Sequence, residues 1–157
     1  MRVTVLGSGS SGGTPQAGTG WGKCDPTNPK NRRRRPSILV KTDETSILVD
    51  TSPDLREQLL DADVTHLDAV LFTHAHADHL HGIDDLRGIN RAMKTTIDAY
   101  ADEDTLEAIY QRFGYVFAPL PKNATSIFKP LLVPHALKDR DTFQIGDIPI
   151  SGFIQDR

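Results

Sequence analysis

The sequence predicts a mixed α/β fold, and three features carry this prediction. Residues 69–72 form a continuous apolar run, which is typical of a strand buried on both faces. Two β-branched and aliphatic runs, 37–40 and 46–49, flank the polar stretch 41–44 and predict a hairpin. Helix-start signals follow the second of these runs and recur later in the chain. Strands that alternate with helices in this order favour packed α/β layers.

The first half of the chain contains a strand, a long loop, the hairpin and a helix. Residues 3–6 read as a short buried strand. Residues 7–36 are rich in Gly, Pro, Thr and Asn and show no periodicity, so they form a long loop, and loops of this length are usually functional or disordered. A helix is expected to begin with Ser52 as its cap, Pro53 at the first helical position and Asp54 at the positive end of the dipole.

A second helix and two further strands are expected in the remainder. Asp104 and Glu107 match a capping box, and apolar residues follow them at helical spacing up to Phe113. Residues 114–140 contain four prolines and give no clear assignment. Residues 142–145 and 148–153 predict two strands joined through a Gly-Asp turn.

Length and composition suit one globular domain over residues 1–157, with 38% hydrophobic and 25% charged residues. No apolar run approaches the roughly 20 residues that span a bilayer, so no membrane association is expected. The first residues lead directly into the predicted strand without a signal-peptide pattern. Cys24 is the only cysteine, which excludes an internal disulfide. These observations favour a cytoplasmic location.

Charge is divided unevenly along the chain. Residues 1–41 carry eight Lys or Arg side chains and one acid, Asp25, whereas the remainder carries ten basic and twenty acidic residues. The first segment therefore has a net charge of +7 and the remainder of −10. Such asymmetry indicates either an anionic partner near the basic segment or a solvated basic loop.

A dense group of histidines follows the apolar strand. Four of the six histidines and one aspartate lie within residues 74–81. Imidazole and carboxylate are ligands of zinc, manganese and iron. His74 and His76 point to the same side if the chain is extended, because side chains alternate. The adjacent Asp78 and His79 point in different directions and are expected to serve a second ion. His81 is left outside the ligand set, and His66 and His135 are interpreted as structural.

The segment His-x-His-x-Asp-His resembles the signature of the metallo-β-lactamase superfamily. Within that superfamily the chain resembles the branch of the phosphonate-pathway cyclic phosphodiesterases, and more loosely the tRNA 3′-processing endonucleases. The similarity is carried by the histidine segment and by residues 7–15, 21–25, 31–37, 47–54 and 82–87. It implies an αββα sandwich, of which this chain supplies roughly the first αβ half.

The resemblance also implies a metal centre and a reaction. Two divalent ions, zinc or manganese, are expected in the complete enzyme, with His74 and His76 on the first ion and Asp78 and His79 on the second. Asp78 is expected to be catalytic as well, by orienting a hydroxide between the ions. Such ions supply hydroxide at neutral pH. Asp50 is expected either to orient a ligating histidine or to cap the end of its strand.

The implied function is a metal-dependent phosphodiesterase acting on a small cyclic phosphate or nucleotide-like ester. Arg34, Arg35 and Arg87 are candidates for contacting the phosphate. The alternatives are a tRNA 3′-processing endonuclease, for which no RNA-clamping arm is evident, a hydrolase of thioesters or lactams, and a non-catalytic metal-binding half-domain. A small phosphate ester is favoured over nucleic acid as the substrate.

The family pattern contains three further ligand positions, and the first of these is expected at or just after Arg157. The chain therefore matches four of seven positions and is expected to form an incomplete centre. A half-sandwich would expose an apolar sheet face, which favours association, for example as a homodimer.

The glycines of residues 7–12 also fit the dinucleotide fingerprint Gly-x-Gly-x-x-Gly, but that motif must open a helix. Further glycines and Pro15 follow instead. The loop is therefore expected to bring backbone close to the metal site, which glycine allows.

Overall fold

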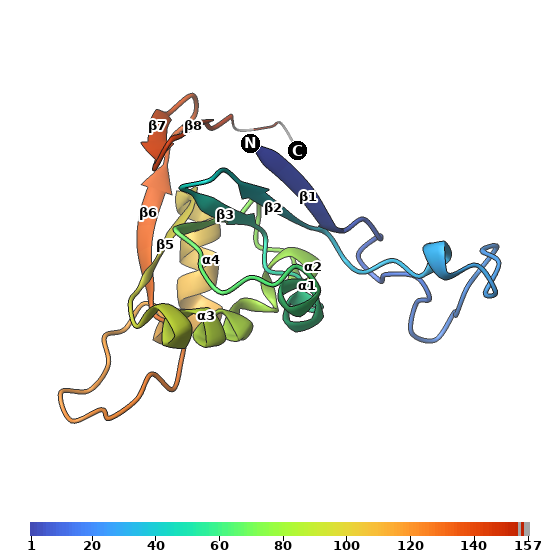
Figure 1. The fold of residues 1–157 in the computed structure, drawn as a ribbon, viewed down its shortest axis with the longest axis horizontal. Helices are drawn as coiled ribbons and strands as arrows, with labels where there is room; N and C mark the ends of the chain where they lie inside the picture. The colour runs from blue at the N-terminus through green and yellow to red at the C-terminus, as the bar shows by residue number, and fades with distance from the viewer. Residues whose placement is uncertain (154, 156–157) are drawn as a thin grey trace.

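The computed structural model describes residues 1–153 and residue 155, and it confirms the mixed α/β fold (Figure 1). Six strands form one sheet in the order β1-β2-β3-β4-β5-β6, and β7 and β8 form a separate two-stranded sheet. The strands are β1 (Arg2–Gly7), β2 (Ser37–Lys41), β3 (Ser46–Val49), β4 (Ala69–Leu71), β5 (Ile97–Asp102), β6 (Leu132–Leu137), β7 (Thr142–Ile145) and β8 (Ile148–Ser151). The α-helices are α1 (Leu55–Asp61), α2 (Ala77–Leu80), α3 (Leu86–Met93) and α4 (Glu103–Phe113).

The pairing of neighbouring strands changes once across the large sheet, from antiparallel to parallel at β3. β1, β2 and β3 are antiparallel neighbours, which confirms the predicted hairpin, whereas β3, β4, β5 and β6 are parallel. Parallel strands require crossover connections, and helices provide them here. The carboxyl ends of β3, β4 and β5 therefore meet at one edge of the sheet, where ligands commonly bind in α/β proteins.

The hydrophobic core lies mainly between the sheet and the helices. Val70 of β4 packs in that core, whereas its neighbour Ala69 packs on the opposite face with Ile145 and Ile148 of the β7–β8 hairpin. Both residues are fully buried. This arrangement confirms that β4 is covered on both faces, and it explains the absence of polar residues from its sequence.

The face of the sheet opposite the helices is only partly covered. The registers Val3↔Val40 and Val5↔Ile38 place these side chains on the same face as Ile47. Val3, Val5 and Ile38 remain exposed, and the exposed fraction of Val5 is 62%. The expected exposed apolar face is therefore present, and association through it stays a prediction.

Both predicted helices begin at different residues from those expected. α1 begins at Leu55 with Asp54 as its cap residue, because the Ser52 hydroxyl accepts a hydrogen bond from the amide of Asp54, before the first turn. α4 begins at Glu103, and its cap is Asp102, whose carboxylate accepts from the amide of Thr105 at 2.6 Å. The predicted cap Asp104 lies instead in the first turn, because β5 continues to Asp102 and the helix follows without a loop.

Several elements were not predicted. Helix α3 and strands β5 and β6 were missed, and β8 ends at Ser151 rather than at residue 153. The family pattern places a further ligand at or just after Arg157, and this residue lies outside the described residues. Over the described ranges, no helix is long and apolar enough to cross a membrane.

Residues 8–36, here called the arm, project from the end of β1 (Figure 1). A 3-10 turn, Pro29–Asn31, is the first helical segment after the glycine run, which agrees with the rejection of the dinucleotide motif. The close approach that glycine permits is to the chain at residues 33–35 and not to the histidine segment. A Cβ atom at Gly7 would lie 2.0 Å from the carbonyl oxygen of Arg35.

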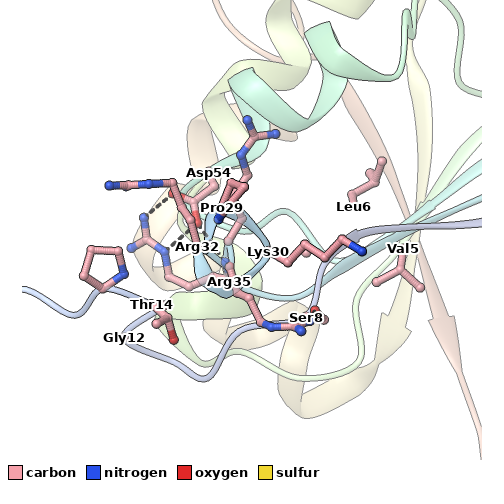
Figure 2. A pocket seen from close by; sticks show the side chains of 15 residues that line it. Val5, Leu6, Ser8, Gly12, Thr14, Pro29, Lys30, Arg32, Arg35 and Asp54 are labelled. Atoms are coloured by element: carbon pink, nitrogen blue, oxygen red, sulfur yellow. Dashed lines mark hydrogen bonds and ion pairs between the residues drawn. The ribbon is translucent and has the colours of Figure 1, made fainter. Parts of the chain in front are cut away.

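An ion pair joins the arm to the body of the protein. The guanidinium of Arg35 donates from Nε and Nη2 to the two carboxylate oxygens of Asp54, at 2.9 and 2.6 Å (Figure 2). The amide of Arg35 adds a third hydrogen bond to Asp54 at 2.8 Å. These bonds from Arg35 lower the pKa of the Asp54 carboxyl from its ordinary value of 3.8.

We predict that Asp54→Asn lowers the free energy of unfolding by about 1–2 kcal/mol near neutral pH, because a partly exposed charged pair is lost. The pKa of Asp54 is lower in the folded chain than in the unfolded chain. The contribution of Asp54 to the free energy of unfolding is therefore full above pH 3.8, and it is lost as the pH falls through the lowered pKa. Urea unfolding of both proteins over a pH series measures the difference.

The control is Asp61→Asn, because Asp61 forms a more exposed ion pair with Arg34. We expect a change below about 0.5 kcal/mol for this variant. A difference between wild type and Asp54→Asn that stays constant down to the acid limit would contradict the assignment.

Candidate metal centre

The four predicted ligands come together at the carboxyl edge of the sheet. Residues 72–76 connect β4 to α2 through a bend at Thr73, and α2 carries Asp78 and His79. The ring of His74 lies 4.6 Å from that of His76 and 4.1 Å from that of His79, between centroids. The segment therefore gathers these imidazoles on one side.

The four side chains form two pairs of donor atoms. His74 Nε2 lies 3.1 Å from His76 Nδ1, and His79 Nε2 lies 3.4 Å from Asp78 Oδ2. Two ligands that share a tetrahedral zinc ion at roughly 2.1 Å are about 3.4 Å apart. Both distances are close to that separation. Asp78 and His79 were expected to point in different directions, but Asp78 Oδ2 and His79 Nε2 lie close together. They do so because Asp50 holds Nδ1, on the other side of the His79 ring.

Asp50 holds the ring of His79. Its carboxylate accepts hydrogen bonds from His79 Nδ1 at 2.7 Å, from the Thr73 amide at 2.8 Å and from the Thr73 hydroxyl at 2.8 Å. Asp50 is 4% exposed and has a φ of 62°, a left-handed conformation that non-glycine residues rarely adopt. The residue therefore orients a histidine, which is one of its two expected roles, and its carboxylate caps the start of the histidine segment rather than the end of its own strand.

These contacts determine which ring nitrogens carry protons. An ionised carboxylate only accepts, so Nδ1 of His79 carries the proton and Nε2 has a free lone pair. The Thr73 hydroxyl donates to Asp50 and lies 3.0 Å from His74 Nδ1, which must therefore donate to that hydroxyl. His74 and His79 thus both present a bare Nε2, which is the form that binds a metal.

The environment of His74 also favours the neutral ring. Burial lowers its pKa, and the positive charges that His79 and His76 can carry lower it further. A neutral imidazole is required for metal ligation, because the lone pair must be free. The chemistry of this donor set is consequently suited to a divalent cation.

Residues 51 and 52 fix the C-terminal end of α2. The Thr51 amide donates to the carbonyl of His79 at 2.8 Å, and the Gly82 amide donates to the carbonyl of Thr51 at 2.9 Å. A Cβ atom at Gly82 would lie 2.0 Å from the carbonyl oxygen of Ser52, so only glycine fits at this position. The short helix is therefore held by the turn that follows β3.

The remaining histidines take structural positions. His81 packs against the ring of Phe113 at 5.6 Å between centroids. His66 pairs with Asp68 at 3.0 Å, and His135 pairs with Asp98 at 2.9 Å. These contacts agree with leaving the three histidines outside the ligand set.

The three candidate arginines are engaged elsewhere. Arg34 forms an ion pair with Asp61 at 2.7 Å, and Arg35 is held by Asp54. Arg87 donates to the carbonyl oxygen of Phe128 at 3.3 Å. Their contact with a phosphate stays a prediction.

A cavity of about 240 Å³ lies between the histidine segment and α4. Asp104, Thr105 and Arg112 of α4 line it together with His74 and His76. Arg112 Nη1 donates to the carbonyl oxygen of Ala75 at 2.6 Å. Sequence reasoning did not include this wall, although an assignment of β5 would have indicated it, because the carboxyl ends of adjacent parallel strands lie together.

No group of three or more His, Cys, Asp or Glu side chains within residues 1–153 and 155 has its donor atoms placed to hold one ion. The histidine segment thus offers two donors to each of two positions. A zinc ion usually takes at least three protein ligands. Neither pair alone reaches this number within the described residues, and metal binding by the two pairs stays a prediction.

The family described as "Beta-lactamase superfamily domain" matches residues 45–154. The chain belongs to the β-lactamase superfamily. An octanoyltransferase of Porphyromonas gingivalis is 40% identical over 151 residues, which cover 96% of this chain and 30% of that protein. The chain spans 30% to 58% of the length of the curated relatives of P. gingivalis and Methylobacterium radiotolerans that it matches.

Solved structures of this superfamily share the fold. A diphosphatase of the PhnP family is 34% identical with a TM-score of 0.76, and the match covers 90% of this chain and 52% of that one. Zinc-bound PqqB of Methylobacterium extorquens is 24% identical with a TM-score of 0.70, and covers 92% and 48%. These likenesses confirm the metallo-β-lactamase fold and the expectation that the chain corresponds to about half of it.

We predict that Asp50→Ala lowers the free energy of unfolding by about 2–3 kcal/mol, because the Thr73 amide and the His79 ring lose a shared buried acceptor. The Thr73 amide should also exchange its hydrogen faster. Urea unfolding and amide exchange measured by NMR test the two effects.

Asp98→Asn is the control, because Asp98 forms an Asp–His contact that is much more exposed than that of Asp50. A change below about 0.5 kcal/mol is expected there. Equal losses in the two variants would show that the three bonds to Asp50 do not have the importance assigned to them.

Proposed function

We propose that the chain contributes to a metal-dependent hydrolase of small phosphodiesters, either cyclic phosphates or nucleotide-like esters. His74 and His76 would hold one divalent ion, and Asp78 and His79 a second. The observation that carries this proposal is the arrangement of four side chains as two donor pairs. The two donor atoms lie 3.1 Å apart in the first pair and 3.4 Å apart in the second. Such separations are those of ligands that share an ion.

The donor set is compatible with zinc or manganese, because nitrogen and carboxylate ligands accept both ions. The zinc-bound PqqB structure, which shares the fold, favours zinc. When bound, such ions provide a nucleophile at neutral pH and neutralise charge on phosphate oxygens. The chain's own residues keep the ligands in place, with Asp50 and Thr73 orienting the rings of His79 and His74.

The proposed catalytic role of Asp78 rests on its carboxylate. Oδ2 faces His79, and within the described residues no hydrogen bond holds Oδ1. That oxygen is able to accept a proton from, or orient, an attacking water. Arg112, at the wall of the adjoining cavity, adds a positive charge near the position of an anionic substrate.

The substrate class is supported by a relative. The similar PhnP-family structure is named a diphosphatase, and at 34% identity it supports a phosphorus ester over a lactam or thioester. Octanoyl transfer is not assigned, because the match covers 30% of the protein with that name.

A second candidate is metal binding without turnover. It is favoured by the presence of only two donors for each ion within the described residues. The two candidates differ in catalysis and agree on the ligands, so one experiment addresses both.

We expect each ligand pair to bind one ion. The double variants His74→Ala/His76→Ala and Asp78→Ala/His79→Ala should each lose about one of two bound ions, since each pair supplies the ligands of one. Metal content after dialysis, measured by mass spectrometry, gives the stoichiometry. Hydrolysis of bis(4-nitrophenyl) phosphate, measured in the same samples, should fall to background in both variants.

His66→Ala is the control, because His66 pairs with Asp68 outside this segment. Unchanged metal content in the double variants would refute the ligand assignment. Metal binding without phosphodiester hydrolysis in the wild type would favour the second candidate, and hydrolysis of thioesters alone would contradict the substrate class.

A further inference from the structure

A second hollow lies in the arm, separate from the histidine segment. A cleft of about 610 Å³ is formed between the glycine-rich loop and the arginine run, and Ser8, Gly12, Lys30, Arg32 and Arg33 are among its lining residues (Figure 2). None of the four proposed metal ligands lines this cleft. Any ligand here would be bound by the arm.

The positive charges around the cleft are only partly neutralised. Arg34 and Arg35 are compensated by Asp61 and Asp54. In contrast, Lys30, Arg32 and Arg33 have no carboxylate partner anywhere in residues 1–153 and 155. Three uncompensated cations in one concave region repel one another and attract anions.

Two of these cations are held in position by uncharged groups. Arg33 Nη1 donates to the hydroxyl of Ser8 at 2.9 Å. The guanidinium of Arg32 lies 5.4 Å from the ring centre of Trp21, a cation–π contact. These contacts orient the guanidinium groups without removing their charge, so they remain able to bind an anion.

The walls of the cleft are fixed by the backbone. Thr14 and Arg33 exchange two amide-to-carbonyl hydrogen bonds of 2.9 Å, and the Gly9 amide donates to the carbonyl of Arg34 at 2.7 Å. A Cβ atom at Gly9 would lie 2.8 Å from that carbonyl oxygen, so glycine permits the close packing. The cations therefore project from a formed ribbon, and binding would require little ordering of the chain.

We propose that this cleft binds the oligophosphate group of a small molecule. Guanidinium groups pair with phosphate oxygens in a bidentate manner, and a lysine adds a point charge. Three positive charges match two or more linked phosphates. The volume falls in the range of roughly 300–1,000 Å³ that small-molecule sites occupy, which favours a compact ligand over a polynucleotide. The site goes beyond the proposed hydrolase, because it needs no metal.

Calorimetric titration with inorganic tripolyphosphate tests the proposal. The protein used in this titration carries the substitutions His74→Ala and His76→Ala, and a chelator is added to the buffer. Binding at the candidate metal centre then does not contribute to the measured heat. We expect saturable binding of one tripolyphosphate per chain. Adding Lys30→Gln and Arg33→Gln should weaken it about 100-fold, at about tenfold for each charged hydrogen bond removed.

Arg56→Gln is the matched control, because Arg56 is an exposed arginine of α1 outside the cleft. The Arg56→Gln variant should bind tripolyphosphate as tightly as the protein without this substitution. Lys30 and Arg33 are exposed, so their replacement should preserve the fold, which circular dichroism checks. Absent binding, or equal affinity in the cleft variant and the control, overturns the proposal. Tighter binding of a single-stranded oligonucleotide than of tripolyphosphate at the same salt concentration also overturns it, in favour of a polynucleotide.

Discussion

The carboxylate of Asp50 is the constraint on which the candidate centre depends. Burying an ionised carboxylate is strongly unfavourable unless donors surround it. Here the donors are the amide and hydroxyl of Thr73 and the ring of His79, so the need to satisfy one buried charge positions both ends of the histidine segment. The same three bonds fix the protonation of two rings. Asp50 therefore determines both the position and the protonation state of these rings, although it is not one of the four proposed metal ligands.

Parallel strand order brings the parts of the centre together. Asp50 follows β3, the histidine segment follows β4, and α4 follows β5. Because these strands are adjacent and parallel, three segments distant in sequence emerge at one edge of the sheet. The cavity beside His74 exists because α4 begins where β5 ends, with no intervening loop. A longer connection there would remove the wall that carries Arg112.

The sequence predicts those features that local patterns encode, and it fails where tertiary context decides. β4 was predictable because both of its faces are buried. The histidine rings were expected to gather because histidines at this density are rare without a cation, and they do lie together, while their role as metal ligands stays a prediction. β5 was missed because its acidic and alanine residues have low strand propensity, although Ile97, Ala99 and Ala101 alternate inward. β6 contains Pro134, which argues against a central strand, but β6 lies at the edge of the sheet, where proline is tolerated. Asp104 matches a capping box with Glu107 and Asp102 does not, yet Asp102 is the cap because β5 continues to that residue.

The arginine run illustrates the same limit for charge. In the sequence Arg32 to Arg35 form one basic patch, yet the structure divides them into two compensated and two uncompensated side chains. Asp61 of α1 compensates Arg34, and Asp54 compensates Arg35. Asp54 belongs to residues 50–54, which connect the arm with the histidine segment. Asp50 holds His79, Thr51 holds α2, Ser52 closes on Gly82, and Asp54 holds Arg35. The hydrogen bond with Asp54 is the main cause of the raised pKa of Arg35, and the negative charge of Asp78 raises that pKa further. A five-residue turn after β3 thus sets the position of the histidine segment relative to the arm, and a substitution within it would alter both.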